Sequence, residues 1–140
     1  MTCPGADLKN ADLSDSRMRR SNFDGADLYR VNLSESSFRD SSAVNTRFFE
    51  ANLTGLDGRR STFSRSNMMR VVASNADFRD ADLTGVDFRK ADLRGVDFRG
   101  AALANVDFRD ADLRGADLRG AQTKAANFKR AKTQGALGLR

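Results

Sequence analysis

The sequence predicts an all-β solenoid, a chain wound into stacked coils, and two observations lead to this fold class. A large apolar residue recurs at every fifth position, as in "VDFRKADLRGVDFRG" at residues 86–100. A small residue recurs two positions earlier, and this spacing puts both side chains on the same side of an extended segment. A five-residue step forms no single stripe on an α-helix and changes face on a flat strand. A chain that turns once per unit, always in the same sense, points every fifth side chain at one axis.

The repeat keeps one frame along nearly the whole chain. With the large apolar residue as the centre, residues 6–135 form 26 units of five residues. We therefore expect a single repeat domain over 6–135, with residues 1–5 as an N-terminal lead-in and residues 136–140 as a short C-terminal tail. The residues on either side of each centre, mostly Asp or Asn before it and Arg, Ser or Thr after it, should point outward. Asp, Asn and Gly near each corner suit tight turns.

Three units in the middle of the chain have small centres. Gly58 stands where a large residue is expected, and Ala43 and Ala73 are undersized. Leu56 occupies a normally small position in the same unit as Gly58 and can compensate for it. Two interpretations stay open here, namely drift in a tolerant repeat and a local bulge or kink.

The repeat unit carries a resemblance to a known family. The segments "ADLKN", "ADLSD", "ADFRD", "ADLTG" and "ADLRG" resemble the pentapeptide-repeat proteins, whose unit is Ala-Asp/Asn-Leu-X-X. The resemblance covers nearly the whole chain, and 26 units in register are a specific signal. It implies a right-handed quadrilateral β-helix with four pentapeptides per coil, and therefore about 6.5 coils. Residues 20 apart would then stack, so that each face can be read as a ladder.

One predicted face carries an arginine after every centre. The last four of its arginines have an aspartate two positions earlier, as in Asp97 and Arg99, and we expect structural ion pairs there. The N-terminal end of this face has little acid beside it, with Asp40 the nearest exception. Clustered guanidinium groups bind carboxylates and phosphates, which makes this corner a candidate anion or phosphate site. The alternative is a solvated charged face. The basic corner consists of Arg17, Arg19, Arg20 and Arg39.

Another predicted face carries apolar residues that point outward, and contiguous exposed apolar patches usually mark interaction sites. Two valines lie one corner before and one corner after it, and charged residues including Glu50 form a polar border, as at protein interfaces. The alternative is cover by the chain's own residues, or aromatic stacking without a functional role. The expected partner-binding patch consists of Tyr29, Val44, Phe49, Met69, Val72, Arg30 and Arg70.

The composition argues against catalysis. The chain has no His, a single Cys near one terminus and no Gly-rich phosphate loop. A convex rod also offers no shared pocket for paired carboxylates. We therefore expect no enzyme activity, no cofactor and no metal. Cys3 cannot form an internal disulfide, and there is neither a membrane-length apolar run nor a signal-peptide pattern, so we expect a cytoplasmic protein.

The expected function is a non-enzymatic rigid scaffold or protein-binding module that presents side-chain ladders to a protein partner of unknown identity. The alternative follows from the resemblance. Some members of that family mimic DNA and regulate or protect type II topoisomerases such as DNA gyrase. Such mimicry requires an acidic surface, and the net charge of +5, spread over both halves of the chain, disfavours it. The weak basic bias and the pairing of acids with bases also make direct nucleic-acid binding an unfavoured third possibility.

The C-terminal segment "ALGLR" contains two leucines that can fold over the last coil or meet a second copy of the chain. The resemblance implies dimerisation through this end, so a homodimer involving Leu137 and Leu139 is a further expectation. Family members that dimerise in this way usually carry a longer extension. Basic residues near this end would also repel one another across such an interface.

Overall fold

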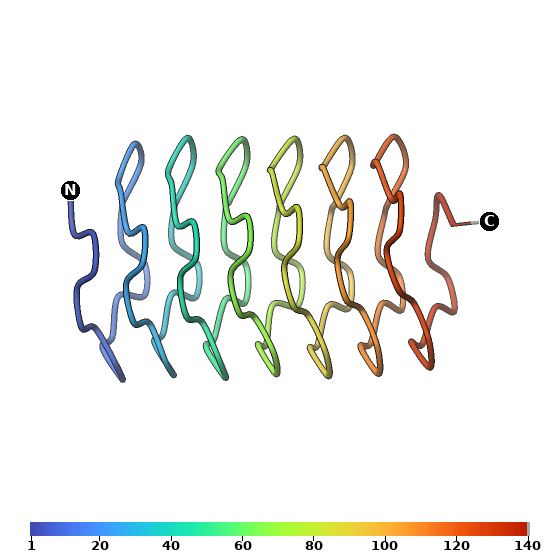
Figure 1. Ribbon diagram of the computed structural model, residues 1–140, viewed down its shortest axis with the longest axis horizontal. Helices are drawn as coiled ribbons and strands as arrows, with labels where there is room; N and C mark the ends of the chain where they lie inside the picture. Colours follow the sequence, from blue (N-terminus) through green and yellow to red (C-terminus); the bar gives the residue numbers. More distant parts are fainter. Residues whose placement is uncertain (140) are drawn as a thin grey trace.

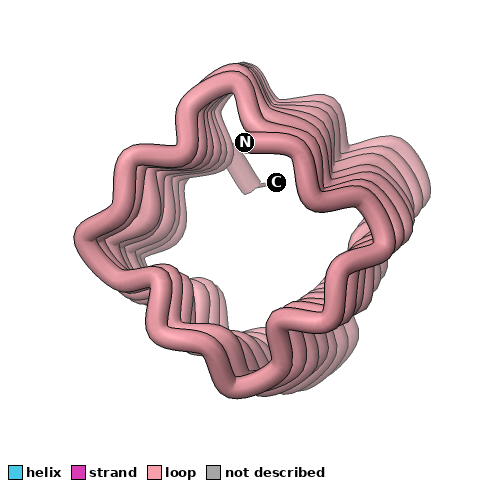
Figure 2. The backbone as a smooth tube through the Cα atoms, turned by 90° about the vertical axis from the view of Figure 1, so that its left-hand side faces the viewer, coloured by secondary structure: helices cyan, strands magenta, loops and turns pink. Residues whose placement is uncertain are grey.

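The computed structural model of the protein describes residues 1–139 and forms a rod of stacked coils, with the two termini at opposite ends (Figure 1). Seen along the rod, the coils lie over one another around a common axis (Figure 2). Parallel β-bridges join each bridging residue to the one 20 positions later, from Thr2–Asn22 to Asp117–Leu137. Each coil therefore takes four five-residue units. Within residues 1–139 the backbone forms these isolated bridges and turns, with no longer strand, no helix and hence no helix able to cross a membrane.

Every unit has the same backbone conformation, and the unit around Leu93 shows it well. The N–H of Leu93 donates to the carbonyl of Asp112 in the next coil at 2.8 Å, and the N–H of Asp92 donates to Val71 in the previous coil at 2.9 Å. A turn then closes with the N–H of Val96 donating to the carbonyl of Leu93 at 3.2 Å. The last residue of each unit has φ between +52° and +73°, as in the third position of a type II turn. This explains why Gly, Asn and Asp are common there.

The core consists of the two inward columns that the repeat predicts. The centre residues are buried without interruption from Met18 to Leu118. Phenylalanines in neighbouring coils stack with nearly parallel rings, with centroids 5.6 Å apart for Phe88–Phe108 and 5.8 Å for Phe78–Phe98. Such aromatic pairs contribute about 0.5–1.5 kcal/mol each beyond the burial of apolar area. The stacked rings therefore tie one coil to the next.

The small centre at Gly58 is filled from the neighbouring coil. A Cβ atom added to Gly58 would lie only 3.0 Å from Cδ1 of Phe78, so the Phe78 ring already occupies the space. Leu56 in the same unit is buried, as its position suggested. The bridges run from Ser37 through Asp57 to Asp77 without a change of register. The unit therefore contains no inserted residue, and the bulge or kink that the sequence left open does not occur.

The N-terminal segment already has the conformation of the repeat. Thr2 bridges to Asn22, and the N–H of Gly5 donates to the carbonyl of Asp24 at 2.8 Å. Residues 1–5, expected as a lead-in, thus pair with the next coil in the same way as the later units.

At the C-terminal end the repeat continues past residue 135 and then closes over the core. Leu137 forms the last bridge, and the chain turns inward at Gly138, where φ is +83°. A Cβ atom there would lie 2.6 Å from backbone atoms of Leu118 and Arg119, so the position requires glycine. Leu139 packs against the core, and Arg140 lies outside the described residues.

Hydroxyl groups in the small column open some of the turns. The Ser41 hydroxyl accepts a hydrogen bond from the N–H of Ser21 at 3.0 Å and donates to the carbonyl of Met18 at 2.8 Å. In most units these two backbone groups bond each other directly. The hydroxyl of a core serine thus hydrogen-bonds both the N–H and the carbonyl that would otherwise close a turn in the preceding coil. The same arrangement is made by Ser36, Ser61 and Ser66.

Candidate interaction surfaces

Tyr29, Phe49 and Met69 form an outward-pointing stack, which we call the apolar ladder. They follow the bridged residues Asp27, Arg47 and Asn67, so they lie on one face in three successive coils. The rings of Tyr29 and Phe49 stack with centroids 5.9 Å apart and an angle of 9° between their planes. All three side chains are half-buried. The ladder is therefore a rigid strip of apolar surface that remains in contact with solvent.

Charged side chains enclose the tyrosine end of the apolar ladder. The guanidinium of Arg47 lies 4.6 Å from the centre of the Tyr29 ring and also binds Asp27 at 3.1 Å. Arg30 lies 5.2 Å from the same ring and pairs with Glu50 at 3.6 Å. The Tyr29 hydroxyl donates to Glu50 at 3.4 Å. Cation–π contacts of this kind hold the Tyr29 ring in place. Phe49 and Met69 are therefore the less covered part of the apolar ladder.

The remaining residues of the predicted patch lie on other faces or at a corner. Val44 belongs to the unit before the apolar ladder, and Val72, which is 42% exposed, belongs to the unit after it. With four units per coil, these two valines lie on opposite sides of the rod. Arg70 is exposed at the corner beside Met69. The structure thus brings Tyr29, Phe49 and Met69 together and separates the two valines from them.

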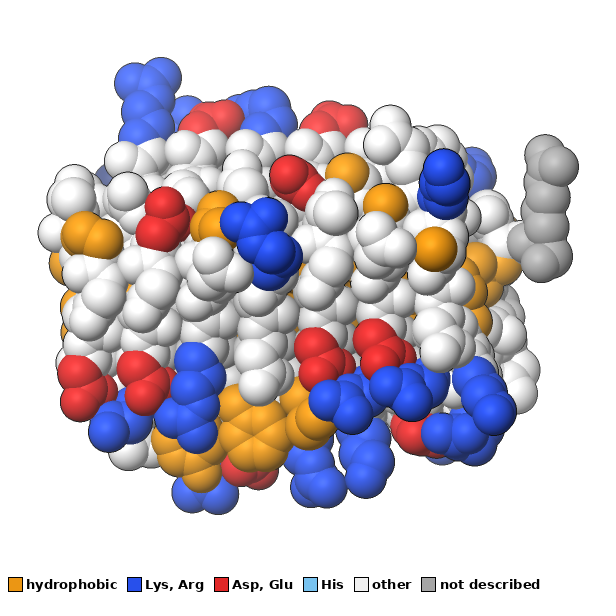
Figure 3. Space-filling view, in the orientation of Figure 1, with side chains coloured by type: hydrophobic (Ala, Val, Ile, Leu, Met, Phe, Trp, Pro, Cys, Tyr) orange, Lys and Arg blue, Asp and Glu red, His pale blue; other side chains and the backbone are white. Residues whose placement is uncertain are grey.

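The space-filling view shows one such cluster of hydrophobic side chains along an edge of the rod, bordered by basic and acidic side chains (Figure 3). The rest of that face carries mostly small or uncharged groups and scattered charges. Further hydrophobic groups lie singly near the opposite edge and at the right-hand end of the same view.

The arginine face is a continuous network of ion pairs. Each aspartate holds the arginine of its own unit and approaches the arginine of the preceding coil. For Asp97 the distances are 2.6 Å to Arg99 and 3.6 Å to Arg79. A hydrogen bond from Arg119 lowers the pKa of Asp117 to about 2. These pairs are partly exposed, so each one stabilises the fold only weakly.

Two further faces carry the same ion pairs, in agreement with the pairing of Asp and Arg along residues 86–100. The sequence signal was an aspartate followed two residues later by an arginine, and it recurs on these faces as it does on the first. Only the fourth face, which includes Ala102 and Ala104, has no such pair among the described residues. The additional pairs are Asp87–Arg89, Asp107–Arg109, Asp92–Arg94 and Asp112–Arg114.

The basic corner divides into one paired arginine and three others. Arg39 Nε lies 2.8 Å from Oδ2 of Asp57. Asp40, the acid expected nearby, is bound by Arg60 at 2.9 Å, and this hydrogen bond lowers the pKa of the Asp40 carboxyl. No carboxylate among residues 1–139 lies within 4.0 Å of the other three. The unpaired and exposed arginines are Arg17, Arg19 and Arg20.

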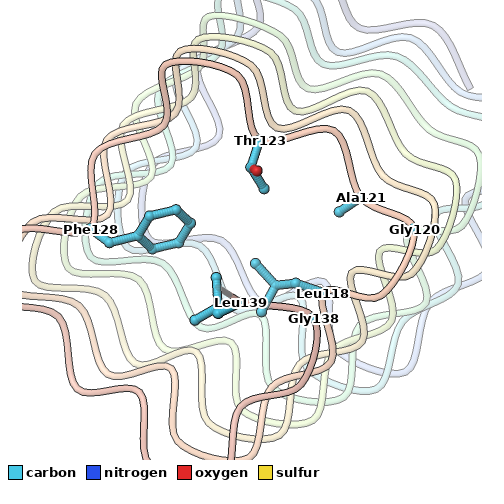
Figure 4. A pocket seen from close by; sticks show the side chains of 7 residues that line it. All are labelled: Leu118, Gly120, Ala121, Thr123, Phe128, Gly138 and Leu139. Atoms are coloured by element: carbon cyan, nitrogen blue, oxygen red, sulfur yellow. The ribbon is translucent and has the colours of Figure 1, made fainter.

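The C-terminal end of the rod contains an open cavity of about 400 Å³ (Figure 4). Leu139 points into it towards Phe128 and Leu118, whereas Leu137 is 49% exposed on the outside. Leu139 therefore covers the last coil, whereas Leu137 remains available to a neighbouring molecule. The lining is apolar apart from one threonine, and no cluster of metal-binding side chains occurs in residues 1–139.

The fold defines a β-solenoid protein built from five-residue units, and comparison with known proteins gives the family. The sequence matches the family described as "Pentapeptide repeats" in eight copies, at residues 5–40, 44–85, 70–100, 81–120 and 91–130. The chain therefore belongs to the pentapeptide repeat family, which confirms the resemblance seen in its sequence. Proteins of this family are in general structural or binding proteins rather than catalysts.

Solved structures of pentapeptide repeat proteins share the fold. HetL from the cyanobacterium Nostoc, which is involved in the regulation of heterocyst differentiation, is 26% identical with a TM-score of 0.56, over 96% of this chain and 75% of HetL. A trypsin-treated form of QnrB1, a plasmid-mediated fluoroquinolone resistance protein, is 20% identical with a TM-score of 0.56, over 96% of this chain and 80% of QnrB1. No curated protein sequence matches significantly.

Proposed function

We propose that the protein is a non-enzymatic scaffold that binds a protein partner through the apolar ladder. The observation that supports this most directly is the stack of Tyr29, Phe49 and Met69 on one face, half-buried and bordered by arginines. Aromatic residues, Met and Arg are the types enriched at protein interfaces. The remaining outward positions of the rod are mostly polar or charged, which makes this strip distinct.

The rigidity of the rod favours binding at such a strip. Tyr29 and Phe49 are held by their mutual stacking and by Arg47, so they lose little side-chain freedom when a partner covers them. The backbone beneath them is fixed in each coil by bridges on both sides. A partner therefore meets a surface that is already in its binding conformation.

The regularity of the register supports a finer description of this scaffold. We infer a right-handed quadrilateral β-helix in which the 26 units of residues 6–135 make about 6.5 coils of four pentapeptides. The 20-residue spacing of the bridges supports four units per coil. A cytoplasmic location and a homodimer through Leu137 and Leu139 belong to the same proposal. Sedimentation of the native protein and of Leu137→Glu tests the dimer, since the charged variant should be monomeric.

The partner-binding proposal is tested by a double variant, Phe49→Asp with Met69→Asp. A pull-down followed by mass spectrometry should recover a partner with the native protein and lose it with the variant. Ala104→Asp, a half-buried position on the face without ion pairs, is the matched control and should retain the partner. Thermal unfolding must show that all three proteins are folded. Unfolding of the double variant would mean that these side chains belong to the core, and unchanged recovery would exclude the ladder as the binding surface.

The chain offers an internal reporter for the purified partner. Tyr29 is the one tyrosine, and there is no tryptophan. A partner that covers the apolar ladder should change the tyrosine fluorescence in a saturable titration, provided that the partner's own signal is subtracted. No change on addition of a partner that binds would place the interface elsewhere.

The alternative function is a DNA-mimic-like regulator or protector of a type II topoisomerase. The net charge of +5 opposes it, as does the pairing of many surface aspartates with arginines. The likeness to QnrB1, at 20% identity, concerns the fold. A DNA gyrase supercoiling assay decides the matter, and no effect at micromolar protein would exclude this function. Retention of DNA at different salt concentrations tests direct nucleic-acid binding in the same way.

A further inference from the structure

The carboxylates of the arginine face are each held by a fixed set of donors. Asp97 accepts hydrogen bonds from the side chain of Arg99 at 2.6 and 2.9 Å and from its backbone N–H at 3.1 Å. Arg79 of the preceding coil approaches the same carboxylate at 3.6 Å. The same set surrounds Asp77, with Arg79 and Arg59 as the two arginines. One position in the ladder thus consists of one carboxylate, two guanidinium groups and one backbone N–H.

At one place in this face the donors are present and the carboxylate is missing. The register puts Ser37 where the later coils have aspartate, between Arg17 and Asp57. The Ser37 hydroxyl oxygen is buried and has no hydrogen-bond partner among residues 1–139. The two arginines that belong to this position are Arg39 of the same unit and Arg19 of the preceding coil.

These arginines lack an aspartate in their own units, although Arg39 is paired with Asp57 of the next coil. The backbone N–H of Arg39 has no acceptor among the described residues, and its Nε makes no aligned hydrogen bond although it lies 2.8 Å from Asp57. Arg19 has no carboxylate within 4.0 Å, because its own unit carries Arg17 in place of aspartate. By register, Arg19, Arg39, the backbone N–H of Arg39 and the Ser37 hydroxyl therefore belong to a position that has no carboxylate of its own unit.

We propose that this position binds a carboxylate supplied by an acidic segment of another protein. The group would take the place of the missing aspartate and accept hydrogen bonds from Arg19, Arg39 and Ser37. A planar carboxylate is favoured over a phosphate because the same donor set holds planar carboxylates in the later coils, with two donors of each arginine directed at them. Arg17 and Arg20 add positive charge nearby and attract an acidic segment.

The carboxylate site is independent of the apolar ladder. Arg19 and Tyr29 belong to units that are two apart on a four-unit coil, so the two features face opposite sides of the rod. A failure of one proposal therefore leaves the other intact, and each can be tested alone.

The test uses variants that fill or weaken the site. Ser37→Asp supplies the missing carboxylate from within the chain and should block binding. Arg19→Gln removes one of the two guanidinium groups and should weaken binding. Asn52→Asp adds the same charge on another face, between Asn32 and Val72, and is the matched control. Binding of a fluorescein-labelled oligoglutamate peptide is followed by anisotropy at low ionic strength, with inorganic phosphate and a single-stranded oligonucleotide as competitors.

We expect Ser37→Asp and Arg19→Gln to weaken peptide binding about tenfold and Asn52→Asp to change it less than about twofold. Ser37→Asp should also raise the melting temperature, because it completes the ladder of ion pairs. Peptide binding that is equal in Ser37→Asp and the native protein would overturn the proposal, as would an equal loss in Asn52→Asp. Stronger competition by phosphate or by the oligonucleotide than by free oligoglutamate would overturn the choice of a carboxylate.

Discussion

The hydroxyl of Ser41 lies 2.8 Å from the carbonyl oxygen of Met18, in the place that a backbone N–H occupies in most turns of the rod. The displaced N–H, that of Ser21, donates to the same hydroxyl at 3.0 Å. One side chain therefore satisfies two backbone groups of the coil before it. A buried hydroxyl in a mostly apolar core is stabilising under this condition, because neither backbone group is left without a partner.

Replacement of Ser41 by alanine tests this role. Ser41→Ala leaves the N–H of Ser21 and the carbonyl of Met18 without their bridge, and we expect a loss of about 1–3 kcal/mol in the free energy of unfolding. Ser74→Ala, at a half-buried position where the hydroxyl makes no hydrogen bond within residues 1–139, should lose much less. Urea denaturation of both variants provides the measurement. Equal stability of the two would show that the turn closes on itself when the hydroxyl is removed.

The filling of the Gly58 site by Phe78 leads to a prediction about coupling. Gly58 does not have a positive φ, so the backbone accepts alanine, but the new Cβ atom would lie 3.0 Å from the Phe78 ring. We expect Gly58→Ala to cost about 1–3 kcal/mol through overpacking. In a Phe78→Leu background the same change should cost clearly less, because the space is then free. A double-mutant cycle by denaturant unfolding measures this, and additive effects would contradict direct contact.

The aspartates that form ion pairs with arginines should make the protein less stable in acid. The pKa of Asp117 is lowered to about 2 by its hydrogen bond with Arg119, and those of Asp97 and Asp112 are lowered in the same direction by their own arginines. The unfolded chain therefore binds protons at a higher pH than the folded one. The free energy of unfolding should be constant above about pH 5 and fall from about pH 4 towards pH 2. Denaturation across this range measures the slope, and the slope should be smaller at 1 M salt.

The cover that Arg47 provides for Tyr29 can be measured directly. In Arg47→Gln the ring loses its cation–π contact at 4.6 Å and the neighbouring ion pair with Asp27. Quenching of the tyrosine fluorescence by acrylamide should increase, while the free energy of unfolding changes by about 1 kcal/mol or less. Unchanged quenching would mean that Phe49 and Arg30, and not Arg47, determine the exposure of the ring.

The fold could be predicted because its determinants repeat in the sequence. The centre column from Met18 to Leu118 and the small column two residues earlier each keep one period, so a single rule accounts for every unit. The filling of Gly58 by Phe78 could not be predicted in the same way. It depends on which rotamer a ring in the next coil adopts, and the period carries no information about rotamers.

The candidate sites were predictable only where side chains follow the register directly. Residues 20 apart were expected to stack, and Tyr29, Phe49 and Met69 do so. The pair between Arg39 and Asp57 crosses from one coil to the next and joins residues 18 apart, so an inspection within single units missed it. The bridging role of Ser41 was missed because serine in the small column was interpreted by size alone.

Because the 20-residue register is unbroken, the number of coils sets the length of the rod, whereas the number of five-residue units between two residues sets whether they lie on the same side. Removal of one coil of 20 residues would shorten the rod and leave every side chain on its original side. Removal of a single five-residue unit, such as residues 56–60, would keep both inward columns filled but rotate the whole downstream chain by one side. Ser74 would then stand beside Phe49 in place of Met69. Surface patterns in such a chain can therefore be exchanged between sides without redesign of the core.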